Sequence, residues 1–186
     1  SQGFCLLNVF LNKMKRNEYR PDIIEEINDV FGTAINSLEG KVFETLIYQL
    51  LRECRLANND SDNIHRIWRK FRQLFENEFL PEYGPNYLFY NIFICYFIHL
   101  YCYVDAAWTE KKLKIIFSET QDEKVFLCAL DGLKYTNFTI GNFNLLKKTQ
   151  VWDKSTELTI PDINVRQMIY EWLGWAYLTG IEKIDG

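Results

Sequence analysis

Apolar residues recur every three or four positions along most of this chain, the spacing that places side chains on one face of an α-helix. No stretch of useful length alternates between apolar and polar residues as a half-buried strand does. The pattern therefore predicts an all-α chain of roughly nine helices, either a multi-helix bundle or an irregular helical-repeat, solenoid-like array. The apolar positions of these helices span residues 4–14, 23–31, 42–54, 64–79, 86–104, 113–117, 125–133, 143–146 and 165–175.

Polar residues and glycines mark several of the predicted helix ends. Asn36, followed three residues later by Glu39, has the N-x-x-E form of a cap that opens the third helix. Gly32 is the expected end of the second helix, and Asp162 is the expected cap of the last one. Residues 150–161 show little periodicity, so this range is predicted to be the longest loop.

Residues 86–104 contain no charged side chain, and this length reaches the roughly 18 residues that a membrane-spanning helix needs. Asn91 and His99 lie well inside the stretch, and its five tyrosines are spread along its length, whereas membrane tyrosines prefer the two interfaces. A helix that is apolar all round is also typical of the centre of a helical protein. The composition therefore favours a buried core helix, with a membrane span as the alternative.

Composition indicates a folded protein rather than a disordered segment. The 186 residues are 48% hydrophobic and 25% charged, and the formal net charge of −4 disfavours a surface that binds nucleic acid generally, though not a local basic patch. Residues 1–186 are expected to form a single all-α segment of a longer protein, since the chain starts at Ser1 without a methionine and stops at Gly186.

The cysteines are odd in number, form no C-x-x-C pair and occupy apolar positions of the helical pattern. This usage predicts buried free thiols and a cytoplasmic location, where thiols stay reduced. The cysteines are Cys5, Cys54, Cys95, Cys102 and Cys128.

The sequence contains none of the glycine-rich phosphate loops, nucleophile elbows or zinc-hydrolase motifs that mark common enzyme classes. We therefore predict a chain that is not an enzyme and uses no cofactor or metal. The strongest candidate for chemistry is Cys95, His99 and Cys102, whose spacing places them on one face of the predicted helix 86–104. Its two thiols would lie about 10 Å apart along the axis, too far to share one zinc ion. Core packing is the favoured interpretation, with a partial metal site or a Cys–His nucleophile as alternatives.

A second candidate is a set of basic residues on the third and fourth predicted helices. Such a set could contact phosphates, although the aromatic residues between them fall on the inward stripe of the helix, where they cannot stack on bases. A solvated helix face or a protein contact is the favoured interpretation, and a nucleic-acid interface is the alternative. The set, called the basic face below, comprises Arg52, Arg55, Arg66, Arg69, Lys70 and Arg72.

Asp105 and Trp108 are expected to form a structural corner at the end of the helix 86–104. An aspartate at such a place can accept hydrogen bonds from the backbone N–H groups of the next helical turn. The Trp108 indole is expected to pack against the helical array.

Three segments resemble parts of the helical C-terminal regions of large bacterial antiphage defence proteins, especially those with a sirtuin-like NADase domain. Residues 34–47 resemble an "IN-S-x-x-G-x-x-x-E-x-L-I" opening, and residues 100–117 are similar to an "L-x-x-L-D-x-x-W-T" corner followed by a short "L-x-x-x-F" helix. Residues 129–135 resemble the "W-x-G-x-L-x" helix that follows, with Ala129-Leu130 where the family often has tryptophan. The chain after Gln150 resembles nothing in that family.

The resemblance implies a non-catalytic interaction, sensor or scaffold module of a larger bacterial defence protein. Such a module recognises a phage protein or another partner, or restrains an effector domain, and the family's NADase residues belong to a domain absent from this chain. The expected partner is a phage protein or other domains of the parent protein, rather than nucleic acid or a membrane, and assembly into a homo-oligomer stays open.

Overall fold

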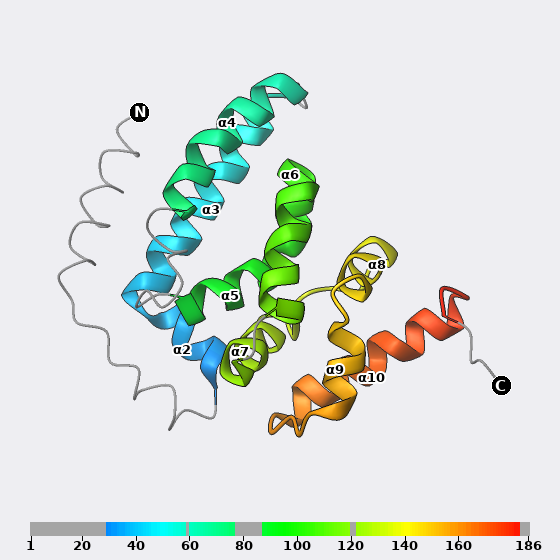
Figure 1. Cartoon of the computed structure of the whole chain (residues 1–186). Coiled ribbons are helices and arrows are strands. Elements are labelled where there is room, and N and C mark those ends of the chain that lie inside the picture. Colours follow the sequence, from blue (N-terminus) through cyan, green and yellow to red (C-terminus); the bar gives the residue numbers. More distant parts are fainter. Residues whose placement is uncertain (1–28, 59, 77–86, 120–121, 183–186) are drawn as a thin grey trace. The chain divides into compact units, whose positions relative to one another are not determined.

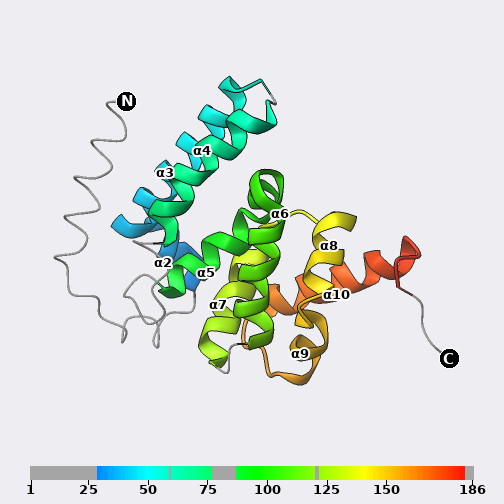
Figure 2. The same cartoon turned by 45° about the horizontal axis from the view of Figure 1, so that its top comes forward.

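The computed structural model of the chain describes residues 29–58, 60–76, 87–119 and 122–182. All regular structure in these ranges is helical, which confirms the all-α prediction, and the chain divides into two compact units, Ser1–Phe93 and Ile94–Gly186. The sequence analysis treated residues 1–186 as one segment and gave no sign of this division. Figures 1 and 2 show the helices in two views. Of the predicted elements, the helix over residues 4–14 and most of the helix over residues 23–31 lie outside the described residues, as does Cys5.

The first unit is built around a hairpin of two long helices that run side by side (Figures 1 and 2). Phe43 is at the centre of its core: its ring stacks on Phe93 at a centroid distance of 4.7 Å and lies 5.2 Å from that of Phe75. Trp68 adds a further ring, 6.0 Å from Phe75. The helices are α2 (Val30–Asn36), α3 (Leu38–Leu56), α4 (Ser61–Leu74) and the first part of α5 (Tyr87–Tyr96).

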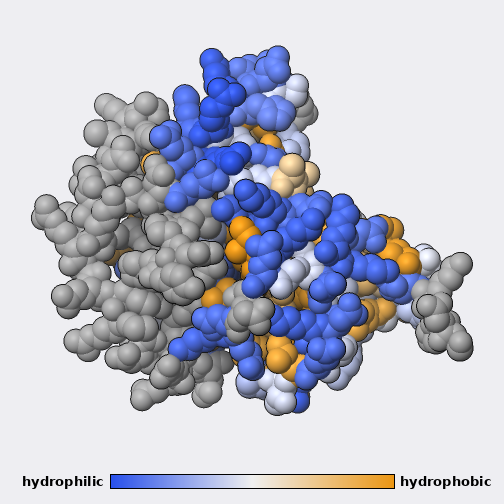
Figure 3. Space-filling view, viewed as in Figure 1, coloured by the Kyte–Doolittle hydropathy of each residue, from blue (hydrophilic) through white to orange (hydrophobic). Residues whose placement is uncertain are grey.

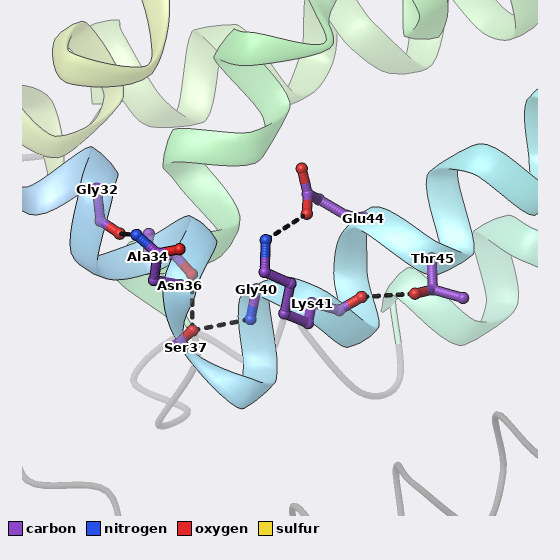
Figure 4. Close-up of polar contacts among 8 residues, drawn as sticks. All are labelled: Gly32, Ala34, Asn36, Ser37, Gly40, Lys41, Glu44 and Thr45. Atoms are coloured by element: carbon purple, nitrogen blue, oxygen red, sulfur yellow. Dashed lines mark hydrogen bonds and ion pairs between the residues drawn. The ribbon is translucent and has the colours of Figure 1, made fainter.

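The corner between α2 and α3 differs from the prediction at both helix ends. Gly32 does not end a helix but lies inside α2, where its N–H donates to the Asp29 carboxylate, the cap of that helix. The cap of α3 is Ser37 rather than Asn36: the Ser37 hydroxyl accepts from the Gly40 N–H at 2.8 Å (Figure 4). Asn36 instead closes α2, because its side-chain amide donates to the Gly32 carbonyl. The "IN-S-x-x-G" residues thus build a tight helix–helix corner.

The second unit contains the rest of α5 and all later helices. Its core includes two groups of rings, the Phe117–Phe126 edge-to-face pair and a chain that runs from Phe143 through Trp152 to Trp172. The helices are α6 (Ile98–Lys114), the π-helical segment η3 (Ile115–Glu119), α7 (Glu123–Leu133), α8 (Ile140–Lys147), α9 (Val151–Glu157) and α10 (Ile163–Leu178).

The expected continuous helix over residues 86–104 is wrong. The chain breaks at Phe97, where the segments Tyr90–Tyr96 and Ile98–Glu119 are bent by 100°. The Thr136 hydroxyl lies 3.1 Å from the Cys95 carbonyl oxygen, so a side chain distant in sequence satisfies a backbone acceptor at the break. Within the described residues, no single helix is both long and apolar enough to cross a membrane. The two segments of this bent pair reach that length and apolar composition only when they are taken together.

The expected loop over residues 150–161 is also wrong, since it contains α9. Gln150 has a positive φ of 58° and redirects the chain into this helix. Val151, Trp152 and Ser155 form its buried face, and the Ser155 hydroxyl donates to the Val151 carbonyl at 2.6 Å. A serine at a buried helical position hides the apolar periodicity that would have predicted the helix.

Candidate interaction surfaces

The corner formed by Asp105 and Trp108 lies within α6. Asp105 has non-helical backbone angles, φ −164° and ψ 86°, and its carboxylate accepts from the Trp108 N–H at 3.0 Å, so it caps the second half of the helix. Trp108 is only 4% exposed, and its ring lies 5.4 Å from the Tyr101 ring. Lys112 approaches the indole face at 5.8 Å. These contacts lie inside the unit, and they give both residues a role in holding α6 in its bent path.

The Cys95, His99 and Cys102 set does not share one helix face. The break at Phe97 places Cys95 on α5 and the other two on α6, and His99 is exposed rather than packed in the core. Burial raises the pKa of the Cys102 thiol to about 11, so at neutral pH the thiol is almost entirely protonated. Thiolate is the form that attacks substrates and binds metals, so this environment opposes both chemistries. Among the described residues, no cluster of three or more potential metal ligands occurs.

The cysteines of the described residues are free thiols in buried or partly buried positions, as expected of structural cysteines. Cys54, Cys95 and Cys128 are buried and free, and Cys102 is partly buried. Burial is the main cause that raises the pKa of Cys128 to about 12.

The basic face lies on the α3–α4 hairpin, whose surface is hydrophilic at the top of Figure 3. Five of its six side chains are exposed. Arg72 is only partly exposed, and its guanidinium donates to the Glu76 carboxylate at 3.0 Å. Arg66 donates to the Asn63 side chain at 2.8 Å. Trp68 and Phe71 are buried against the core of the hairpin, so they cannot stack on a nucleic-acid base.

The outer side of α10 is a surface that the sequence analysis missed. Ile163, Tyr170 and Tyr177 are seven residues apart, lie along one side of the helix and are 67%, 70% and 51% exposed. Leu178 next to them is 74% exposed. Figure 3 shows hydrophobic surface on the right, over the end of α10. The buried side of the helix was predicted from Val165, Met168, Ile169 and Trp172, and the same spacing could have identified the apolar residues that remain on the opposite side.

A cavity of about 440 Å³ lies beside this surface, between the segment that follows α7 and the inner edge of α10. Phe138 and Trp172 contribute rings in an edge-to-face contact, with centroids 5.5 Å apart. Trp175, the last apolar position of the helix predicted over residues 165–175, is 55% exposed and lines the same cavity. The buried stripe of α10 continues from Trp172 to Ala176, and Trp175 lies beside it on the more exposed side of the helix.

Lys134 lines the cavity, and two carboxylates hold its ammonium in place. Its ammonium is 2.6 Å from the Asp131 carboxylate and 2.8 Å from that of Asp162, which also caps α10. Burial opposes the charged form of Lys134, but the hydrogen bonds to these carboxylates outweigh it and raise the lysine pKa. The ion pairs thus fasten the end of α7 to the start of α10 and fix one wall of the cavity.

No protein-family model, curated protein or solved structure matches this chain.

Proposed function

We propose that this chain is a cytoplasmic, non-catalytic helical module of a larger bacterial defence protein, in which the helices form an irregular repeat-like array. Its role is to recognise a phage protein or another domain of the parent protein, or to restrain an effector domain. The defence setting is supported by the resemblance of residues 34–47, 100–117 and 129–135. The interaction role is supported by the outer side of α10.

The single observation that carries the interaction role is the exposure of large apolar side chains on one helix. Among the described residues, α10 exposes Ile163, Tyr170, Tyr177 and Leu178, each by more than half of its surface. Contiguous exposed apolar residues are characteristic of protein-binding surfaces, and tyrosine in particular is enriched where proteins meet. We infer that a partner protein covers this side of α10.

We expect a photo-crosslinking amino acid at Tyr170 or Tyr177 to capture a discrete protein in bacterial cells. Tyr103 on α6 provides a matched control position, because this tyrosine is 53% exposed and lies in the same unit. A product that forms only after phage infection identifies a phage protein, whereas one that forms in uninfected cells identifies a resident partner. Equal labelling at all three positions would contradict the proposal.

A nucleic-acid interface on the basic face is the alternative, favoured by the five exposed cations of this face. If it is correct, the affinity for a labelled DNA duplex should fall steeply with salt, with a log–log slope of about −0.9 for each phosphate neutralised. Replacing Arg66, Arg69 and Lys70 together with glutamine should then reduce the slope by about 2.7. Lys111→Gln on α6 is the control and should leave it unchanged. Binding that is weak and insensitive to these substitutions would eliminate the alternative.

A further inference from the structure

The cavity beside α10 combines an exposed aromatic ring with the carboxylate of Glu171. Its walls include Phe138, Trp172 and Trp175, and the ring of Trp175 is more than half exposed to solvent. Its volume of about 440 Å³ lies within the range of roughly 300–1,000 Å³ that is usual for ligand pockets. The cavity is therefore large enough to admit a long side chain together with part of its backbone.

The charge around the cavity is negative. Lys134 is the one cation that lines it within the described residues, and its ammonium is already paired with the Asp131 and Asp162 carboxylates. Glu171 adds a further carboxylate and forms no ion pair among the described residues. The Gln167 side-chain amide donates to Glu171 at 2.8 Å and holds this carboxylate in place. A carboxylate next to an exposed indole ring is the environment that attracts an organic cation.

We propose that this cavity binds an arginine side chain of the protein that docks on α10. The inference rests on the proposed function, because the partner on α10 supplies the arginine. Gln167 and Glu171 line both this cavity and the shallow surface beside Ile163 and Tyr170 on the outer side of α10. A partner segment that lies along α10 can therefore direct one of its side chains into the cavity.

The lining of the cavity fits a guanidinium better than an ammonium. A guanidinium is planar, stacks on an indole ring and offers five N–H donors in a fixed plane. Glu171 can accept two of these donors, and Asn137 and Asn164, which line the same cavity, have side-chain carbonyls that can accept others. A lysine ammonium is compact and strongly hydrated, so it gains less from the same set of rings and amides.

The test uses N-acetyl-arginine amide as the probe and ¹H–¹⁵N NMR of the tryptophan indole N–H groups as the readout. The chain has five tryptophans, and the Trp175→Phe variant assigns the signal of Trp175. We expect the arginine probe to shift this signal saturably, with N-acetyl-lysine amide weaker and the neutral isostere N-acetyl-citrulline amide without effect. Glu171→Gln should weaken arginine binding about tenfold, the loss expected when a charge-assisted hydrogen bond is removed.

Two further variants keep the result interpretable. Glu157→Gln removes an exposed carboxylate from α9 in the same unit and should bind the probe like the parent chain. Trp175→Ala should abolish the shift that the arginine probe causes at the indole signal of Trp172, which lines the same cavity. Without the probe, the remaining indole signals should keep their positions, which shows that the unit is folded. Equal shifts with arginine and citrulline, or unchanged affinity in Glu171→Gln, would overturn the inference. Crosslinking at Tyr170 that persists under those outcomes would leave the docking role of α10 intact, so the two proposals fail separately.

Discussion

Replacing Trp108 with alanine is expected to lower the free energy of unfolding by about 3–5 kcal/mol, the usual loss for a large aromatic residue in a core. The indole is 4% exposed and contacts the Tyr101 ring, which is itself fully buried. Its removal leaves a cavity at the point where α6 changes direction, and the Asp105 cap cannot fill it. Urea unfolding followed by circular dichroism measures the loss.

The companion variant Asp105→Ala should lose only about 1 kcal/mol, because it removes one capping hydrogen bond from a partly exposed site. Tyr177→Ala is a matched control for the tryptophan variant. It truncates an aromatic side chain that is 51% exposed in the same unit, and its effect should stay within about 0.5 kcal/mol. If Trp108→Ala and Asp105→Ala both unfold like the parent but lose a binding partner, the corner is a recognition site rather than a structural one.

The helices that could be predicted from sequence are those with polar residues on one side. α4 shows the principle, because its buried Ile64, Trp68 and Phe71 alternate with exposed charged side chains at helical spacing. Residues 86–104 lack this contrast, and their apolar side chains fit a continuous helix and a broken one equally well. The break at Phe97 depends on Thr136, about 40 residues away in sequence, whose hydroxyl bonds to the end of α5. Local periodicity carries no information about such a contact.

The candidate sites show the same limit. The capping role of Asp105 follows from its place before a helical turn, and the structure has this hydrogen bond. Trp175, by contrast, has the spacing of a buried residue, but Ala176 occupies the buried position, and Trp175 is 55% exposed and lines the cavity. Cys95, His99 and Cys102 were predicted to share one helix face on the assumption of a straight helix. They do not share a face because the chain breaks at Phe97. The Asp105 cap, which lies within one helical turn, was thus predictable, whereas the sites that depend on how helices meet were not.

The α2–α3 corner provides the second large expected effect. Replacing Gly40 with alanine should lower the free energy of unfolding by about 3 kcal/mol, the upper end of the usual loss for overpacking. A Cβ atom at this position would lie 1.8 Å from the Ala34 carbonyl oxygen and 2.8 Å from the Ala34 carbonyl carbon. Both are backbone atoms, so the conflict cannot be relieved by rotating a side chain. α3 would have to move away from α2, which would also weaken the hydrogen bond from the Ser37 hydroxyl to the Ala34 carbonyl oxygen.

Gly174→Ala is the control that separates this contact from the general effect of alanine in a helix. Gly174 also lies inside a helix, α10, but a Cβ atom there would meet no atom within 4 Å. Alanine favours the helical state over glycine, so this variant should gain roughly 0.5–1 kcal/mol. The two substitutions are chemically identical and should change the urea midpoint in opposite directions. A Gly40→Ala chain that is as stable as the Gly174→Ala chain would show that the backbones of α2 and α3 do not approach each other as closely as the corner requires, and the structural role assigned to the "S-x-x-G" residues would then be wrong.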